Sequence, residues 1–245
     1  MRSYFFGAFV LCGSLGLLLS LAGCTKHASA TAPLVSKVYG TQIVEVSGSK
    51  QVVGVGSRLS DPIVVQVNGA DGNALPGALV SLHGEGVVLN PAQVLTDTSG
   101  QVSVQAQLGG IPGNYQIVAE TTKADRGSIS LTMRETALGY QGKLGKEIND
   151  KYCRFCHDPE STPERVSNFD NLAPPQPHQF TDGATLNSWS NADLIKIVSE
   201  GGPALGKSPQ TPAYANTLTP AQIKAVVAYI RAVADPAYEP APAKH

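Results

Sequence analysis

The sequence predicts two domains, an all-β sandwich followed by an all-α domain. Its 245 residues exceed one typical domain and suffice for two separate cores. Apolar and polar residues alternate from about residue 37 to residue 135, which is the pattern of half-buried strands. After a predicted linker at 136–142, apolar residues recur at helical spacing over 143–234. The change of period therefore separates the two domains.

Residues 1–23 have the pattern of an export signal. Arg2 gives a positive start, and Tyr4 to Ala22 is uncharged and mostly apolar, so a membrane-spanning helix is the alternative. The residues LAGC that end at Cys24 resemble the lipobox of bacterial lipoproteins. That resemblance implies cleavage before Cys24 and its acylation, which anchors the mature chain to a membrane without spanning it.

The residues after Cys24 bear on location. Thr25 directly follows Cys24. By resemblance to lipoproteins that lack Asp at this position, we expect the protein in the outer membrane, facing the periplasm or the cell surface. Residues 24–36 are small and polar and predict a flexible tether. Because Cys12 leaves with the signal and Cys24 carries lipid, two cysteines remain for chemistry.

Residues 37–135 predict an antiparallel β-sandwich. In the run 101–108, valine, alanine and leucine alternate with glutamine and serine, and the runs 63–67, 115–119 and 129–133 repeat the pattern. Turn-forming residues separate these runs. Several short strands without a convincing helix favour a sandwich.

Two stretches of this domain carry a family resemblance. DPIVVQVNGADGNALPGALVSL and TDTSGQVSVQAQLGGIPGNYQIVAET resemble the bacterial Ig-like repeats of invasin and intimin. The resemblance implies an Ig-like domain that serves as a rigid spacer or as an adhesive module. Since no titratable groups converge in these stretches, we expect a structural stalk.

The second domain predicts three helices. The first carries apolar residues one turn apart from Leu144 to Tyr152. Capping boxes begin the other two, at Ser190 and at Thr219. Residues 235–245 are rich in Pro and Ala and predict an unstructured tail. The face of the last helix expected to be buried comprises Ile223, Val226, Val227, Ile230 and Val233.

One motif carries the chemistry. Residues 153–157 read CRFCH, and C-x-x-C-H is the attachment site of a c-type haem. The thiols of Cys153 and Cys156 can add to the two vinyl groups of one porphyrin, and His157 then supplies the proximal nitrogen to iron. A zinc site would need a second Cys/His pair, and a thioredoxin-like dithiol would need a βαβ context. We therefore predict one covalent haem c.

Residues 139–234 resemble the small class I cytochrome c domain. The resemblance includes the helix that runs into CRFCH, the stretches PPQPHQFTDG and SNADLIKIVSEGGPALGKSP, and the closing LTPAQIKAVVAYIRAV. It implies that the first and last helices cross near the haem. The residues it places near the macrocycle, each with plain core packing as the alternative, are Leu144, Ile148, Val226, Tyr229 and Trp189.

One position departs from that family. Its distal loop reads G-K-S-P-x-M-P, and the methionine is the sixth iron ligand. Here residues 206–212 read GKSPQTP, which puts Thr211 in that place. Met133 belongs to the last predicted strand, so the helical domain contains no methionine. The usual His/Met pair therefore cannot form within this domain.

Three alternatives stay open for the sixth position. His178, in the Pro-rich loop, would give bis-histidine ligation. Lys207 or Tyr214, close to Thr211 in the sequence, would ligate, although Lys must first lose its proton. Otherwise the position is open or holds water, and the Thr211 hydroxyl can hydrogen-bond a bound molecule.

These patterns predict an electron-transfer protein of the cell envelope that docks a redox partner protein. The 18 Lys and Arg against 19 Asp and Glu give a net charge of −1, which does not favour nucleic-acid binding. The alternative is a haem protein with an open position, acting as a small-ligand sensor or as a peroxidase with His178 as acid/base. An enzyme is therefore an open possibility, with the carrier favoured. An adhesin with a vestigial haem domain is disfavoured by the intact motif.

Overall fold

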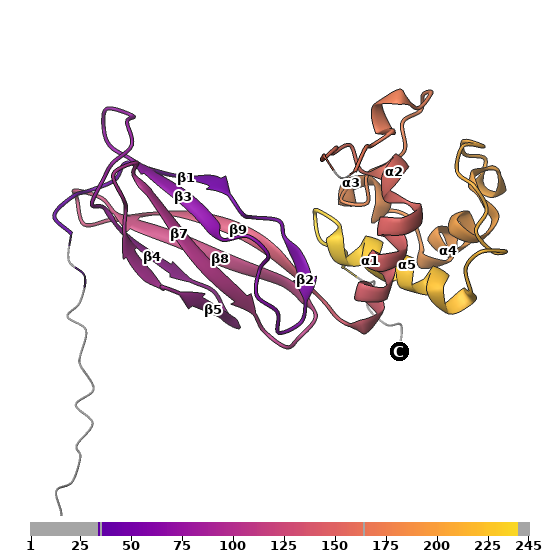
Figure 1. The fold of residues 1–245 in the computed structure, drawn as a ribbon, viewed down its shortest axis with the longest axis horizontal. Helices are drawn as coiled ribbons and strands as arrows, with labels where there is room; N and C mark the ends of the chain where they lie inside the picture. The colour runs from indigo at the N-terminus through magenta and orange to yellow at the C-terminus, as the bar shows by residue number, and fades with distance from the viewer. Residues whose placement is uncertain (1–33, 35, 164, 240–245) are drawn as a thin grey trace, which may run out of the picture. The chain divides into compact units, whose positions relative to one another are not determined.

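The computed structural model describes residues 34, 36–163 and 165–239. It shows a sandwich of strands followed along the chain by a group of helices, which confirms the predicted fold class (Figure 1). The export signal, Cys24 and most of the predicted tether lie outside the described residues, as do the last six residues of the tail. In the described part, no helix is long and apolar enough to cross a bilayer.

Two sheets form the sandwich in the described residues. The first has the order β1-β3-β7-β5 and the second has the order β2-β9-β8-β4-β6. All neighbours are antiparallel except β2 and β9, which are parallel. The strands are β1 Gln42–Ser47, β2 Val52–Gly54, β3 Ile63–Asn68, β4 Leu79–His83, β5 Val87–Asn90, β6 Gln93–Leu95, β7 Gln101–Leu108, β8 Gly113–Thr122 and β9 Ser128–Leu138.

The sandwich core follows the alternation seen in the sequence. In β3 and β7 every second side chain is buried, and the residues between them are half-buried or exposed. The sheet pleat sends successive side chains to opposite faces, so one face of each strand enters the core. The core residues with no exposed surface include Ile63, Val65, Val67, Val80, Val104, Ala106 and Ile117.

The predicted linker at 136–142 is not a separate segment in the structure. Strand β9 continues to Leu138 because β2 pairs with its end, Val52 opposite Thr136 and Gly54 opposite Leu138. Helix α1 begins at Tyr140, so Gly139 alone joins strand and helix. A Cβ at Gly139 would lie 2.8 Å from the Pro112 side chain, which explains the glycine. Residues 136–142 are thus the end of strand β9, Gly139 and the first turn of helix α1.

The helical domain contains three long helices and several short ones in its described part. The capping boxes predicted at Ser190 and at Thr219 are both present, the first with Asp193 and the second with Gln222. The helices are α1 Tyr140–Tyr152, α2 Arg154–His157, η1 Phe169–Asn171, α3 Gly183–Leu186, α4 Asn191–Glu200, η2 Gly202–Leu205 and α5 Pro220–Val233.

Helices α1 and α5 lie side by side and form the centre of this domain (Figure 1). They approach closely at Gly145, where an added Cβ would lie 2.0 Å from the Ala225 carbonyl oxygen and 2.7 Å from Tyr229 Cβ. Ile148 of α1 and Val226 of α5 are buried in the same core cluster. The close crossing fixes the end of α1, which leads directly into residues 153–157.

Candidate haem-binding site

The end of α1 presents the three residues of the predicted haem motif. Cys153 closes α1 and opens the short helix α2, with its N–H bonded to Asn149 O at 2.9 Å. The N–H groups of Cys156 and His157 both donate to the Cys153 carbonyl, at 3.1 Å each. This tight turn places both sulfurs and the imidazole along the wall of one cavity.

Burial sets the protonation of one thiol. The Cys153 side chain is buried. This burial and, to a smaller extent, the charge of the nearby Cys156 raise the pKa of Cys153 to about 12. A redox-active dithiol of the thioredoxin kind needs a lowered thiol pKa. The environment of Cys153 therefore argues against that alternative.

The His157 ring is held with one nitrogen free. Its Nδ1 lies 2.6 Å from the His178 carbonyl oxygen, and because a carbonyl only accepts, Nδ1 carries the proton and donates. Burial lowers the pKa of His157, which favours the neutral imidazole. The Phe180 ring packs 4.6 Å from the imidazole, centroid to centroid. Nε2 is thus the unprotonated nitrogen, as an iron ligand requires.

The cavity beside this motif fits a porphyrin. Its volume is about 600 Å³, within the range of cofactor sites. The sulfurs of Cys153 and Cys156 and the His157 ring lie on its wall, where a covalently attached haem needs them. The apolar part of the wall includes Leu172, Leu186, Trp189, Leu194, Ile197, Val198 and Ile230.

The loop that carries Thr211 lines another part of the same cavity. Two hydrogen bonds hold this loop to Gly202, whose N–H donates to Thr211 O at 3.0 Å and whose carbonyl accepts from Lys207 N–H at 2.9 Å. A Cβ at Gly202 would lie 2.0 Å from Ser208 O, so only glycine permits this approach. The backbone path at Thr211 is therefore fixed by main-chain contacts.

Each predicted candidate for the sixth position already has a partner. The Tyr214 hydroxyl donates to Tyr152 O at 3.0 Å, and burial raises the pKa of Tyr214, which disfavours the phenolate. The Lys207 Nζ lies 5.1 Å from the Trp189 ring centroid, a cation–π contact. Either side chain must leave its partner before it can bind iron.

His178 contacts His157 through its carbonyl, and both residues line the 600 Å³ cavity. The His178 carbonyl accepts from His157 Nδ1–H, so residue 178 is on the side of the imidazole that faces away from Nε2. Its own ring donates from Nδ1 to Asp182 Oδ2 at 3.1 Å. To bind iron, the His178 ring would have to give up this bond to Asp182. The geometry favours a supporting role on the proximal side.

The other residues expected near the macrocycle fall into two groups, those that line the cavity and those that do not. Trp189 lines the 600 Å³ cavity, together with Ile230 of α5. Ile148 and Val226 are core residues of the helical domain, and Leu144 packs against that core, so the alternative of core packing describes them. Tyr229 lines a different cavity.

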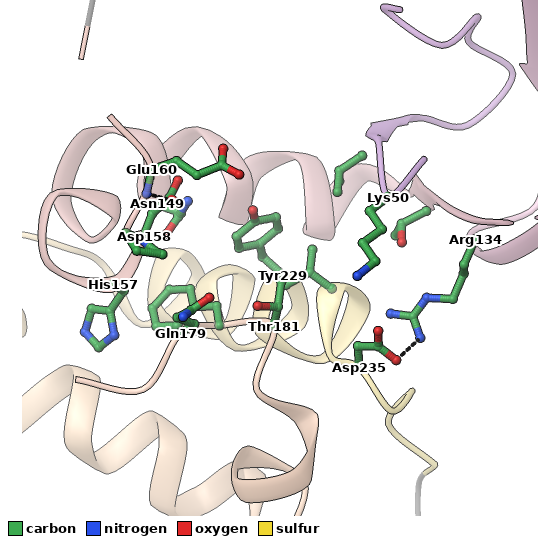
Figure 2. A pocket seen from close by; sticks show the side chains of 15 residues that line it. Lys50, Arg134, Asn149, His157, Asp158, Glu160, Gln179, Thr181, Tyr229 and Asp235 are labelled. Atoms are coloured by element: carbon green, nitrogen blue, oxygen red, sulfur yellow. Dashed lines mark hydrogen bonds and ion pairs between the residues drawn. The ribbon is translucent and has the colours of Figure 1, made fainter. Parts of the chain in front are cut away.

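That different cavity has a volume of about 550 Å³ and is lined by residues from both domains. Figure 2 shows Lys50 and Arg134 of the sandwich on one part of its wall and Tyr229 of α5 on another. Arg134 forms an ion pair with Asp235, Nη1 to Oδ1 at 3.1 Å, and its Nη2 donates to Ala234 O at 2.8 Å. Burial raises the pKa of Tyr229 to about 12.

Sequence reasoning missed Phe180, Asp182 and Arg134. Phe180 and Asp182 lie within the quoted stretch PPQPHQFTDG, but their contacts with the motif depend on the loop's path. Arg134 is one of the polar residues of an alternating strand and carries no signal that sets it apart. The carbonyl of His178 acts through the main chain, which no residue type reveals.

Residues 141–230 match the family model described as "Cytochrome C oxidase, cbb3-type, subunit III". The helical domain is cytochrome c-like. This match spans the motif, the loop of Thr211 and most of α5. No curated protein matches the chain.

Solved structures match the sandwich part. The "D00-D0 domain of Intimin" is 17% identical over 43% of this chain and 50% of that chain, with a TM-score of 0.30. Domains 4 and 5 of the S-layer protein SbsC are 13% identical over 43% and 55%, with a TM-score of 0.31. The Yersinia pseudotuberculosis adhesin InvE is 12% identical over 41% and 32%, with a TM-score of 0.29. This chain spans about half of the length of the intimin structure and about a third of the adhesin structure.

Proposed function

We propose that the chain is a c-type cytochrome that carries one covalent haem and transfers electrons in the cell envelope. The observation that carries the proposal is the His157 ring, which donates from Nδ1 to the His178 carbonyl and lines a largely apolar cavity together with Cys153 and Cys156. When bound, the haem supplies a one-electron iron(III)/iron(II) couple.

The chain's own residues then serve to attach, orient and shield. The two thiols provide covalent attachment, and Phe180 with the His178 carbonyl fixes the ring plane of His157. Leu194, Ile197 and Ile230 would cover a bound haem with apolar side chains. A fixed ligand and an apolar wall suit a carrier, because its site changes charge without making or breaking bonds in the protein.

The attachment is tested with cysteine variants of the full chain, expressed in a host that attaches c-type haem. We expect Cys153→Ala and Cys156→Ala each to weaken covalent attachment and the double variant to abolish it. Pyridine haemochrome absorbance after acid-acetone extraction measures what remains. Cys12→Ala is the control, since this residue leaves with the predicted signal. Haem that stays with the double variant through extraction contradicts the proposal.

A haem protein with an open sixth position is the second candidate, favoured by the contacts that occupy Tyr214, Lys207 and His178. We expect Thr211→Met to install a thioether ligand, because main-chain bonds already fix the loop and methionine is unbranched. The variant should become low-spin, raise its reduction potential and lose carbon monoxide binding. His178→Ala should leave the wild-type spectrum unchanged. Identical spectra for wild type and Thr211→Met would exclude this placement of the loop.

Location is part of the same proposal. The lipobox at Cys24 supports a lipid anchor in the outer membrane, with the sandwich as spacer between lipid and haem and a redox partner protein in the envelope. Cys24→Ala should leave the precursor uncleaved or release the protein from the membrane fraction. Fractionation with globomycin-treated wild type as reference measures both. Mature, membrane-bound protein with alanine at this position would show another anchor.

A further inference from the structure

The hydrogen bond that orients His157 depends on a residue in a loop. His178 lies in the Pro-rich stretch, and its side chain is 50% exposed. Its carbonyl is nevertheless only 2.6 Å from His157 Nδ1, so something must hold the main chain at residue 178. The position of this carbonyl sets the strength of the bond to the proximal imidazole.

Asp182 holds His178 in place. One carboxylate oxygen, Oδ2, accepts from His178 Nδ1 at 3.1 Å, and the other, Oδ1, accepts from Thr185 N–H at 3.1 Å as the N-cap of α3. The hydrogen bond from the Thr185 N–H makes the largest contribution to lowering the pKa of Asp182. The group is therefore a carboxylate at neutral pH. A single side chain thus joins the His178 loop to a helix start.

The segment around Asp182 is in turn paired with the residues that follow α5. Asp235 N–H donates to Thr181 O at 2.9 Å, and Gly183 N–H donates to Asp235 O at 3.1 Å. A Cβ at Gly183 would lie 2.2 Å from Pro236 O, so glycine is needed for this approach. Residues 181–183 therefore follow the position of Asp235.

Asp235 is held by the sandwich. Arg134 of β9 contacts the Asp235 carboxylate at 3.1 Å (Figure 2). It also contacts the Ala234 carbonyl, at 2.8 Å. Strand β9 is paired on both sides, with β8 and with β2, so the base of this side chain is fixed in a sheet. Four consecutive contacts then run from the sheet to His157.

We propose that Arg134 and Asp182 are positioning residues for the proximal histidine, so that the sandwich takes part in the haem site. The inference rests on the proposed function, because it needs iron bound at His157. A carbonyl held on Nδ1–H makes the imidazole a stronger donor, which favours iron(III). Loosening any contact in the series weakens that bond and raises the reduction potential.

The test uses the full chain loaded with haem. Arg134→Gln removes the ion pair, Arg134→Lys keeps the charge but not the two-pronged contact, and Asp182→Asn keeps the capping oxygen but loses the acceptor for His178 Nδ1–H. The exposed Arg58 of the sandwich supplies the control Arg58→Gln. Three quantities are measured: the reduction potential, solvent exchange of the His157 Nδ1 proton by NMR, and exchange of the Gly183 amide.

We expect Arg134→Gln and Asp182→Asn to raise the potential and to speed exchange of the His157 ring proton by a factor of about 2 to 10, the range for loss of one hydrogen bond. The reduction potential and the ring-proton exchange rate of Arg134→Lys should lie between those of these variants and those of wild type. Both quantities should be unchanged in Arg58→Gln. The Gly183 amide should exchange faster in Arg134→Gln, since Asp235 O, at 3.1 Å, is one of its two acceptors beside Thr181 O at 2.8 Å.

Two outcomes overturn the inference, and they differ from failure of the proposed function. Faster Gly183 exchange with an unchanged potential and ring proton would mean that Arg134 only joins the domains. An unchanged potential in Asp182→Asn would remove that residue from the series, even if the arginine variants fold poorly. Failure of the proposed function shows earlier, as wild-type protein that carries no covalent haem.

Discussion

The sandwich fills its core with its own side chains, whereas the helical domain is built around a cavity. In the sandwich, Ile63, Val65 and Val104 have no exposed surface. In the helical domain, Leu194, Ile197 and Ile230 face a space of about 600 Å³. Since burial of apolar surface is the main stabilising term, the first domain is complete as a chain and the second is completed by its cofactor.

The largest expected effect follows from removal of that cofactor. An unfilled cavity of this size costs at most about 14 kcal/mol, less as water enters, which is comparable with the whole stability of a domain. The haem-free double variant Cys153→Ala/Cys156→Ala should therefore lose the cooperative unfolding of the helical domain and keep that of the sandwich. Trp189 is the chain's single tryptophan, so its fluorescence reports the helical domain alone.

The matching measurement for the sandwich is circular dichroism near 217 nm. Two separate transitions, one shifted by loss of haem and one unchanged, are expected. A single coincident transition in both forms would show that the domains unfold as one unit and would remove the contrast drawn between them.

How far the sequence predicted each domain follows from the same contrast. Local patterns fixed the strands of β3 and β7 and the capped starts of α4 and α5, because alternation and caps depend on neighbours in sequence. The CRFCH motif named the site for the same reason. The predicted linker failed because pairing of β2 with β9, which extends the strand, joins residues far apart in the chain.

The second prediction concerns the crossing of α1 and α5. Gly145→Ala places a Cβ 2.0 Å from a carbonyl oxygen, and the helices must separate. Overpacking of this kind costs about 3 kcal/mol, which exceeds the gain of about 1 kcal/mol from helix propensity. The midpoint temperature of thermal unfolding, followed by Trp189 fluorescence, should fall. The midpoint of the sandwich transition should not change.

Gly142 of the same helix is the matched control. A Cβ there would meet the end of the flexible Leu138 side chain at 3.1 Å, which can move. Gly142→Ala should therefore be neutral or stabilising. Equal losses in both variants would mean that glycine serves a general need of α1 rather than the close crossing.

The third prediction concerns the one carboxyl with no exposed surface in the described sandwich core, Glu135. Its Oε2 accepts from Gln51 N–H at 2.7 Å, yet burial, with a contribution from the charge of Glu45, raises the pKa to about 7 from 4.5. Because the folded state holds this proton more tightly, the free energy of unfolding falls as pH rises from 4.5 to 7. The loss is about 3 kcal/mol at most.

Glu135→Gln keeps an oxygen acceptor for Gln51 and cannot ionise. Its sandwich should therefore be more stable than wild type above pH 7 and should lose the slope between pH 4.5 and 7. Urea titrations at several pH values, followed by circular dichroism, measure both. Glu85→Gln, at an exposed site, is the control. The same slope in Glu135→Gln as in wild type would assign the pH dependence to other groups.

The smallest expected effect is at the start of α4. The Ser190 hydroxyl accepts from Asp193 N–H at 3.1 Å, and the Asp193 carboxylate accepts from Ser190 N–H at 3.3 Å. Ser190→Ala should cost the helical domain about 1 kcal/mol, and Ser190→Asp should restore most of it. Helix α4 supplies Leu194, Ile197 and Val198 to the haem cavity, so bound haem should hold the helix and reduce the loss. Urea unfolding of holo and haem-free protein, each with and without the substitution, measures this coupling. An equal loss in both forms would show that the wall of the cavity is set before haem is attached.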